Sequence, residues 1–224
     1  MDEVLDWEDG SRTDPIRNEF VIPFVSEYLN KERIPSIIDI GAATGYLSRE
    51  INQRLSYDAS WTLVDSDRRR LDYAETNRPQ NMKQQIICGD ALDSIFNDVR
   101  YEAVLVSFSL LELGTSQTVM QKLNSLCATD GSLIFIVPDV WQDILAESMK
   151  SGSHDIVSKF LEKPVNLTKV DRFTGVEYPF IADRLERIID CVMQMEFSLK
   201  VFTEHSIGSK RVYGLIFRNQ AANG

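Results

Sequence analysis

The stretch SIIDIGAATGYL, residues 36–47, constrains the fold of this chain more than any other. An apolar, β-branched run around Ile37 and Ile40 predicts a buried strand, and Gly41 ends it. Apolar residues then recur at helical spacing from Tyr46 onwards, so the sequence predicts a strand, a tight glycine turn and a helix. Glycine permits unusual backbone angles and the helix presents unpaired N–H groups, so a nucleotide-like ligand fits there.

The glycine spacing in this turn narrows the choice of ligand. It departs from the NAD-binding pattern G-x-G-x-x-G, because Ala43 and Tyr46 stand where the second and third glycines belong. The string DIGAATG, from Asp39 to Gly45, instead resembles the D-x-G-x-G-x-G signature of class I S-adenosylmethionine (SAM)-dependent methyltransferases, with Ala43 in place of the middle glycine. A buried strand followed by an ordinary tight turn would give a similar string, so the context decides.

Length and charge limit what the chain can be. With 224 residues, 43% of them hydrophobic, it can bury the core of one globular domain. Its formal net charge is −10, so a surface that grips nucleic acid would have to concentrate the cations in one patch. The only cationic cluster, residues 68–70, is interpreted as a solvated helix face. The N-terminus is acidic, without the apolar core of a signal peptide, and no apolar run has membrane-spanning length. We therefore expect a cytoplasmic protein that binds neither nucleic acid nor membrane.

The cysteines and histidines give no sign of a metal site. Cys88, Cys127 and Cys191 are far apart in apolar runs, which is typical of buried free thiols in a reducing compartment. His154 and His205 lie apart from every cysteine, and metal ligands would have to cluster. We expect no metal.

Acidic residues follow two further predicted strands. Asp65 ends the strand of residues 60–64, twenty residues after the last glycine of the turn, where a carboxylate can accept hydrogen bonds from a ribose diol. A mere helix cap at this position stays open. The strand of residues 85–88 leads to the string GDAL, and in the methyltransferases that this chain resembles such a string contacts the adenine through its aspartate, here Asp90.

The remaining strands complete the fold prediction. The sequence predicts buried strands at residues 103–106 and 132–137, with a helix of residues 116–127 between them along the chain. This alternation of strands and helices predicts a parallel sheet covered on both faces, with ligands at the carboxyl ends of the strands. A helix of residues 181–195 and a strand pair close the chain. We predict an α/β fold: a Rossmann-like, doubly wound sheet of about seven strands, mostly parallel, with the C-terminal antiparallel hairpin that the resemblance implies.

The N-terminal residues 13–32 carry apolar side chains at helical spacing, and Pro23 should divide them into two short helices, with Pro23 near the start of the second. They either cover the sheet or form a lid over the pocket, as in many small-molecule methyltransferases that the chain resembles. We expect one domain, 1–224, and divide it into an N-terminal helical lid (13–32), a SAM-binding core (34–140), an irregular substrate-side insert (141–180), and a closing helix and β-hairpin (181–218).

The resemblance implies transfer of a methyl group from SAM to an O, N or C atom of a small molecule. The segment after the fourth strand, residues 107–113, lacks the N/D-P-P-Y/F string of enzymes that methylate exocyclic nucleobase amines or glutamine side chains. Two alternatives stay open: a protein or RNA methyltransferase that acts with a partner, and a noncatalytic SAM-binding module. The oligomeric state cannot be read from the sequence, which leaves a homodimer open.

In-line placement of donor and acceptor alone can contribute roughly 7–11 kcal/mol, so a dedicated catalytic residue is not required. Where the acceptor needs a general base, the candidates are His154, Tyr178 and Asp139, and Glu177 and His205 are further residues considered. The expected cofactor-binding residues are Arg17, Asp39, Gly41, Ala42, Ala43, Gly45, Asp65, Ser66, Asp90, Ala91 and Ser107. Arg17 would reach the cofactor carboxylate or the substrate from the lid.

Overall fold

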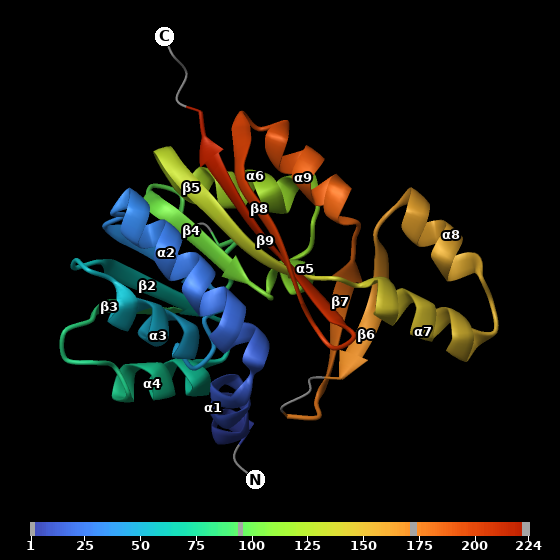
Figure 1. The fold of residues 1–224 in the computed structure, drawn as a ribbon, viewed down its shortest axis with the longest axis horizontal. Helices are drawn as coiled ribbons and strands as arrows, with labels where there is room; N and C mark the ends of the chain where they lie inside the picture. The colour runs from blue at the N-terminus through green and yellow to red at the C-terminus, as the bar shows by residue number, and fades with distance from the viewer. Residues whose placement is uncertain (1–2, 94–95, 171–173, 221–224) are drawn as a thin grey trace.

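A computed structural model describes residues 3–93, 96–170 and 174–220 (Figure 1). Along the chain the elements are α1 (Glu3–Thr13), the π-helix η1 (Ile16–Val21), α2 (Ile22–Glu32), β1 (Ser36–Ile40), α3 (Tyr46–Arg54), β2 (Ser60–Asp65), α4 (Arg68–Thr76), β3 (Lys83–Cys88), β4 (Tyr101–Ser107), α5 (Leu110–Leu113), α6 (Gln117–Leu126), β5 (Cys127–Pro138), α7 (Trp141–Ser151), α8 (Asp155–Glu162), β6 (Val165–Val170), β7 (Glu177–Ala182), α9 (Leu185–Met193), β8 (Phe197–Ile207) and β9 (Lys210–Asn219).

The main sheet has seven strands in the order β3-β2-β1-β4-β5-β9-β8. The strands β1 to β5 pair in parallel, whereas β9 runs antiparallel to both β5 and β8. The chain reverses its strand order between β1 and β4, which is where ligands bind in open α/β sheets. The predicted Rossmann-like sheet with an antiparallel C-terminal pair is confirmed.

Helices cover the sheet on both faces, because successive side chains of the buried strands point to opposite sides. In β5, Leu133 and Phe135 join the core beneath α6 and α9, whereas Ile134 and Ile136 join the core beneath α2, α3 and α4. Strands buried on both faces read as continuous apolar runs, which is why they are recognisable in the sequence. None of the described helices is both long and apolar enough to cross a membrane.

The insert of residues 141–180 is not irregular, so that part of the prediction is wrong. It contains α7, α8 and most of a separate two-stranded antiparallel sheet, β6-β7, and it lies on the side of the molecule away from β3 (Figure 1). The half-buried pattern of β6 and β7 gives a weak apolar signal, and a proline is tolerated at residue 179 because each strand of a pair has an unpaired edge. The closing helix begins at Leu185 rather than Ile181, since Ile181 belongs to β7.

The N-terminal segment differs from the prediction in one helix. Pro23 does lie at the start of α2, after the short η1, as predicted. The acidic residues before them, however, form α1, which contacts α3 and α4. The buried residues of α1 are Val4, Glu8 and Ser11, two of them polar, so no apolar periodicity marks the helix.

The cysteines are free thiols, as predicted, but they are not all buried. Cys127 is buried, Cys191 is partly buried, and Cys88 is exposed. Cys88 ends β3, which is an edge strand with a single neighbouring strand, so solvent reaches its side chain. The prediction of buried thiols is therefore wrong for Cys88.

Candidate functional site

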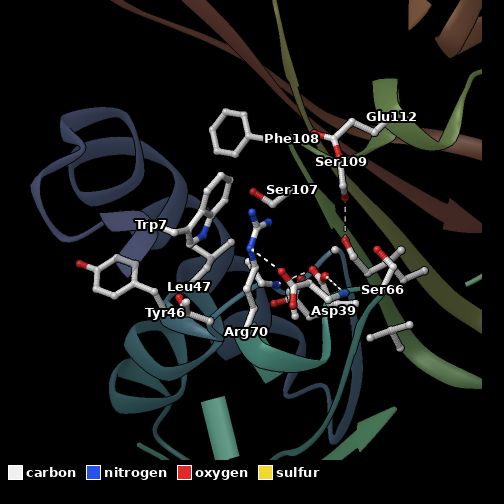
Figure 2. A pocket seen from close by; sticks show the side chains of 18 of the residues that line it. Trp7, Asp39, Tyr46, Leu47, Ser66, Arg70, Ser107, Phe108, Ser109 and Glu112 are labelled. Atoms are coloured by element: carbon white, nitrogen blue, oxygen red, sulfur yellow. Dashed lines mark hydrogen bonds and ion pairs between the residues drawn. The ribbon is translucent and has the colours of Figure 1, made fainter. Parts of the chain in front are cut away.

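A pocket of about 490 Å³ opens at the carboxyl ends of the parallel strands. It is lined by the glycine loop after β1, by the residues that follow β2, β3 and β4, by one face of α1, and by the start of η1. Residues of β7 and of the segment before it, Thr174, Val176 and Tyr178, complete the wall. Figure 2 shows side chains from these distant parts of the chain, among them Trp7, Asp39, Ser66 and Phe108, converging on the pocket.

The glycine loop takes backbone angles that most side chains disfavour. Gly41 has φ +76°, and a Cβ atom built on it would lie 2.5 Å from Ser109 Cβ. Its N–H donates to Val64 O at 2.8 Å, which holds the loop to β2. Gly45 does not line the pocket; it begins α3 with φ +69°, and its Cβ would lie 3.0 Å from the Leu63 side chain. Gly45 thus has a packing role between helix and sheet, and its contact with the cofactor stays a prediction.

Ala43 occupies the position of the middle glycine with φ +48°. A left-handed backbone costs an L-residue roughly 1–2 kcal/mol, and glycine loses part of that gain to its greater chain entropy. Ala43→Gly should therefore raise the free energy of unfolding by up to about 1 kcal/mol and keep SAM affinity, as urea titration and calorimetry can measure. The neighbouring Ala42, which has no positive φ, is the matched control, and Ala42→Gly should destabilise by about 0.5–1 kcal/mol. Loss of SAM binding in folded Ala43→Gly would contradict this account.

Asp65 ties the end of β2 to the glycine loop. Its Oδ2 accepts from Ala43 N at 2.8 Å, and its Oδ1 accepts from Asp67 N at 2.9 Å. The helix cap of α4 is Asp67, whose Oδ1 accepts from Arg69 N, so capping is not the role of Asp65. The half-buried carboxylate therefore faces the pocket with a position fixed by two backbone donors.

The other expected residues also gather at this edge of the sheet. Ser66, Asp90, Ala91 and Ser107 line the pocket after their strands, and Asp90 Oδ1 accepts from Leu92 N at 2.8 Å. Gly41, Ala42, Ala43, Asp39 and Arg17 line it as well. Of the eleven residues expected to bind cofactor, Gly45 alone is outside the described lining.

Asp39 is a buried acid at the base of the pocket, 2% exposed, and it accepts a short hydrogen bond from the Ser48 hydroxyl. Burial raises the pKa of this carboxyl from 3.8 to about 6; the Ser48 hydroxyl lowers it, and the nearby Asp65 charge raises it. The folded state therefore holds the Asp39 proton more tightly than the unfolded chain does.

This raised pKa makes stability depend on pH. Between pH 3.8 and about 6 the folded protein binds more protons at Asp39 than the unfolded chain, so this residue lowers the free energy of unfolding as pH rises through that window. Asp39→Asn keeps the shape and removes the titration. Above pH 6 we expect the variant to be more stable than the wild type by about 1–3 kcal/mol, and below pH 4 the difference should vanish. Parallel pH profiles in urea unfolding would contradict the assignment.

Two buried hydroxyl oxygens in the pocket wall lack a partner among the described residues: Thr44 Oγ1 and Ser107 Oγ. Buried polar atoms are normally hydrogen-bonded, so orphaned hydroxyls that line a pocket fit a polar ligand. They lie after β1 and at the end of β4, on either side of the reversal in strand order.

Several lining residues are not recognisable in the sequence. Trp7 lines the pocket from α1, with the Arg70 guanidinium 4.6 Å from its ring centre. Arg70 also pairs with Glu3 at 3.1 Å, so it is not part of a solvated face as interpreted from the sequence. The Glu3, Trp7 and Ser11 spacing of four residues is a helical signal that could have identified this face of α1.

Arg17 sits between two aromatic rings at the pocket wall. Its guanidinium carbon lies 5.5 Å from the Trp7 ring centre and 5.1 Å from that of Phe108, and its Nη1 donates to Asp14 Oδ2 at 3.1 Å. Phe108 has φ +65°, an angle that side chains of its size rarely adopt. Strain of this kind persists where the surroundings fix it, and here it lies at the pocket wall.

The candidate general bases differ in whether they line the pocket. Tyr178 lines the pocket, whereas Asp139 lines a second cavity of about 80 Å³ beyond β5. His154 is exposed at the start of α8, and His205 stacks on Phe20 at 4.9 Å. Glu177 is exposed on β7. Neither Asp139 nor His154 is in the described lining of the pocket, and α7 separates His154 from the end of β5. Among the described residues no group of three or more His, Cys, Asp or Glu side chains could hold a metal ion.

The strand order, with β9 inserted antiparallel beside β5, and a pocket over the glycine loop define the class I SAM-dependent methyltransferase fold. Residues 37–131 match the family described as the methyltransferase domain. This match covers the segment from β1 into β5, and the fold that the sequence resemblance implies is confirmed.

Solved structures agree on the fold. Magnesium protoporphyrin IX methyltransferase from Synechocystis PCC 6803, with bound S-adenosylhomocysteine (SAH), is 14% identical, and the match covers 92% of this chain and 84% of that one with a TM-score of 0.67. A SAM-dependent methyltransferase from Methanosarcina mazei is 17% identical over 88% and 97%, with a TM-score of 0.67. N-methyltransferase NodS from Bradyrhizobium japonicum WM9 is 14% identical over 92% and 98%, with a TM-score of 0.57. A search of curated protein sequences finds no match.

Proposed function

We propose that this protein transfers a methyl group from SAM to a nucleophilic atom of a small molecule. The observation that carries the proposal is the shared pocket: the glycine loop, Asp65, Asp90 and Ser107 come from four strand ends and line one cavity. Each residue alone could have an ordinary structural role, such as a turn or a helix cap. Their convergence on one pocket, at the edge of the sheet where the strand order reverses, fits a nucleoside ligand.

The residues present fit the cofactor. Asp65 would accept hydrogen bonds from the ribose hydroxyls, and Asp90 would take the adenine amine, as the family resemblance implies. The orphaned hydroxyls of Thr44 and Ser107 offer further polar partners, and Arg17 would take the cofactor carboxylate or the substrate. When bound, the cofactor supplies an activated methyl group on a sulfonium. The residues of this chain then have to orient the acceptor and exclude water, which alone lowers the barrier substantially.

The wall beyond the glycine loop supports a small acceptor with an apolar or aromatic portion. Phe108, Leu113, Val176 and Tyr178 are among the residues that line the pocket, and Tyr178 adds a hydroxyl to them. Such a surface, apolar with a few polar groups, is typical of small-molecule sites. One similar structure is named for methylation of magnesium protoporphyrin IX and another is an N-methyltransferase. These names support a small-molecule acceptor without identifying it.

The test is incorporation of labelled methyl from SAM, screened in parallel across metabolite fractions, RNA and protein. We expect label in small molecules, and SAH should inhibit the reaction. Label only in protein or RNA would favour a macromolecular acceptor instead. No incorporation together with tight SAM binding would favour a noncatalytic SAM-binding module.

The segment proposed as a lid is α1 with the first residues of η1, which is shifted toward the N-terminus from the residues 13–32 expected from the sequence. Trp7, Ser11 and Arg17 line the pocket, whereas Val25 and Leu29 of α2 are fully buried in the core. A lid that excludes water should close with the ligand.

Hydrogen exchange tests this lid directly. Amides of residues 3–18 should exchange more slowly after SAH is added, because closure protects their hydrogen bonds. Amides of α2, which packs in the core, should be protected equally with and without SAH, and they are the internal control. Arg17→Ala should lose turnover more than stability. Strong protection of residues 3–18 in both states would make the segment ordinary packing and remove Arg17 from the site.

We also propose a cytoplasmic location, because three widely separated cysteines suit a reducing compartment. The acidic composition supports the absence of a nucleic-acid partner. Light scattering coupled to size exclusion distinguishes a monomer from the homodimer that the sequence leaves open.

A further inference from the structure

Glu8 of α1 and Arg49 of α3 form a buried ion pair beside the glycine loop. Arg49 Nη2 donates to Glu8 Oε1 at 2.7 Å, and the two side chains are 7% and 2% exposed. Neither residue is in the described lining of the pocket. A buried pair of this kind contributes little net stability compared with apolar residues of the same size, because both charges lose their hydration.

The same guanidinium holds the glycine loop. Arg49 Nη1 donates to Thr44 O, and a Cβ built on Gly45 would lie 3.4 Å from that nitrogen. Thr44 lies between two residues with positive φ, Ala43 at +48° and Gly45 at +69°. Backbone of this kind is kept only where its surroundings fix it, and Arg49 is a rigid planar donor that can hold two acceptors at once.

Glu8 connects this guanidinium to the pocket-lining helix. Glu3, Trp7 and Ser11 of α1 line the pocket, and Glu8 lies on the side of α1 that contacts α3. Glu8 Oε2 is buried without a hydrogen-bond partner among the described residues, so Oε1 carries the contacts that fix this side chain. The second guanidinium on Oε1 is that of Arg12, at 3.0 Å, and its side chain is 59% exposed.

We propose that Glu8 and Arg49 are positioning residues for methyl transfer. One buried guanidinium fixes the Thr44 carbonyl of the glycine loop and the carboxylate of α1 in a single arrangement, so that loop and helix close on the cofactor together. This inference rests on the proposed function, since it assigns a role in holding SAM.

The test compares Glu8→Gln with Arg12→Met, using SAH as the probe. Glutamine keeps the shape and the acceptor oxygen but removes the charge opposite Arg49. We expect the SAH dissociation constant of Glu8→Gln to rise at least about tenfold, and the SAH-dependent protection of α1 in hydrogen exchange to be lost. Arg12→Met removes the exposed partner of the same oxygen and should stay within about twofold of wild type.

If Glu8→Gln fails to fold, a double variant still tests the positioning role. Glu8→Gln/Arg49→Met leaves no unpaired charge, so it should regain a melting temperature near that of the wild type while SAH binding stays weak. A wild-type dissociation constant in either folded variant, or an equal loss in Arg12→Met, would overturn the positioning role. Wild-type protein that binds no SAH would instead contradict the proposed function itself, so the two failures are distinguishable.

Discussion

Asp65→Ala should weaken SAM binding by about 1.5–3 kcal/mol, the range for hydrogen bonds to a charged group, which corresponds to about 10–150-fold in the dissociation constant. The proposed cause is loss of the carboxylate that accepts the ribose hydroxyls. The structure adds a second cause, because Asp65 Oδ2 also accepts from Ala43 N and so shapes the glycine loop. Calorimetry on the folded variant measures the effect.

Two variants separate these causes. Asp65→Asn keeps an oxygen that can accept from Ala43 N and should lose less affinity than Asp65→Ala. Ser116→Ala removes the cap of α6, which is outside the described lining of the pocket, and should lower stability by about 0.5–2 kcal/mol without a comparable loss of SAM affinity. An unchanged dissociation constant in Asp65→Ala would remove this residue from the site.

Gly41→Val should be the most disruptive single change in the loop. The new Cβ would lie 2.5 Å from Ser109 Cβ and 2.6 Å from its Oγ, and that hydroxyl already donates to Ile40 O. The left-handed backbone costs roughly 1–2 kcal/mol and the overlap roughly 1–3 kcal/mol more. We therefore expect the free energy of unfolding to fall by about 2–5 kcal/mol, with SAM binding lost, as urea unfolding and calorimetry can measure.

The hairpin residue Gly208 offers the matched control for this variant. It has φ +60°, and nothing lies within 4 Å of its Cβ position. Gly208→Val therefore carries the backbone cost without the overlap and should lower the free energy of unfolding by only about 1–2 kcal/mol, with SAM binding kept. Equal losses in the two variants would mean that Ser109 moves freely and that the loop geometry is not fixed as described.

The parts of the fold that the sequence predicted are those with one dominant physical signal. The strands β1, β4 and β5 are buried on both faces, so they appear as apolar β-branched runs. The helix α1 could not be predicted in this way, because two of its buried side chains, Glu8 and Ser11, are polar, and Glu8 is held by Arg49 of α3. The strands β6 and β7 are half-exposed, and proline at 179 argues against a strand unless the edge is known to be free.

The residues of the candidate site also differ in whether a local sequence signal marks them. Asp65 and Asp90 were found from their positions after strands, because parallel strands end at one edge of the sheet. Trp7 and Arg70 were missed because tertiary packing alone brings α1 to α4. Asp139 was placed near the site since it also follows a strand, yet β5 lies next to β9, and Asp139 N donates to Arg211 O on that side.

The pocket at the carboxyl ends of β1, β2 and β4 is the proposed binding site for SAM. Calorimetric titration of the wild-type protein with SAH tests it most directly, because the measurement needs no knowledge of the acceptor. We predict one molecule bound per chain, with binding displaced by SAM and weakened about 10–150-fold in Asp65→Ala. No heat of binding at millimolar SAH, or binding of equal strength in folded Asp65→Ala, would contradict the account.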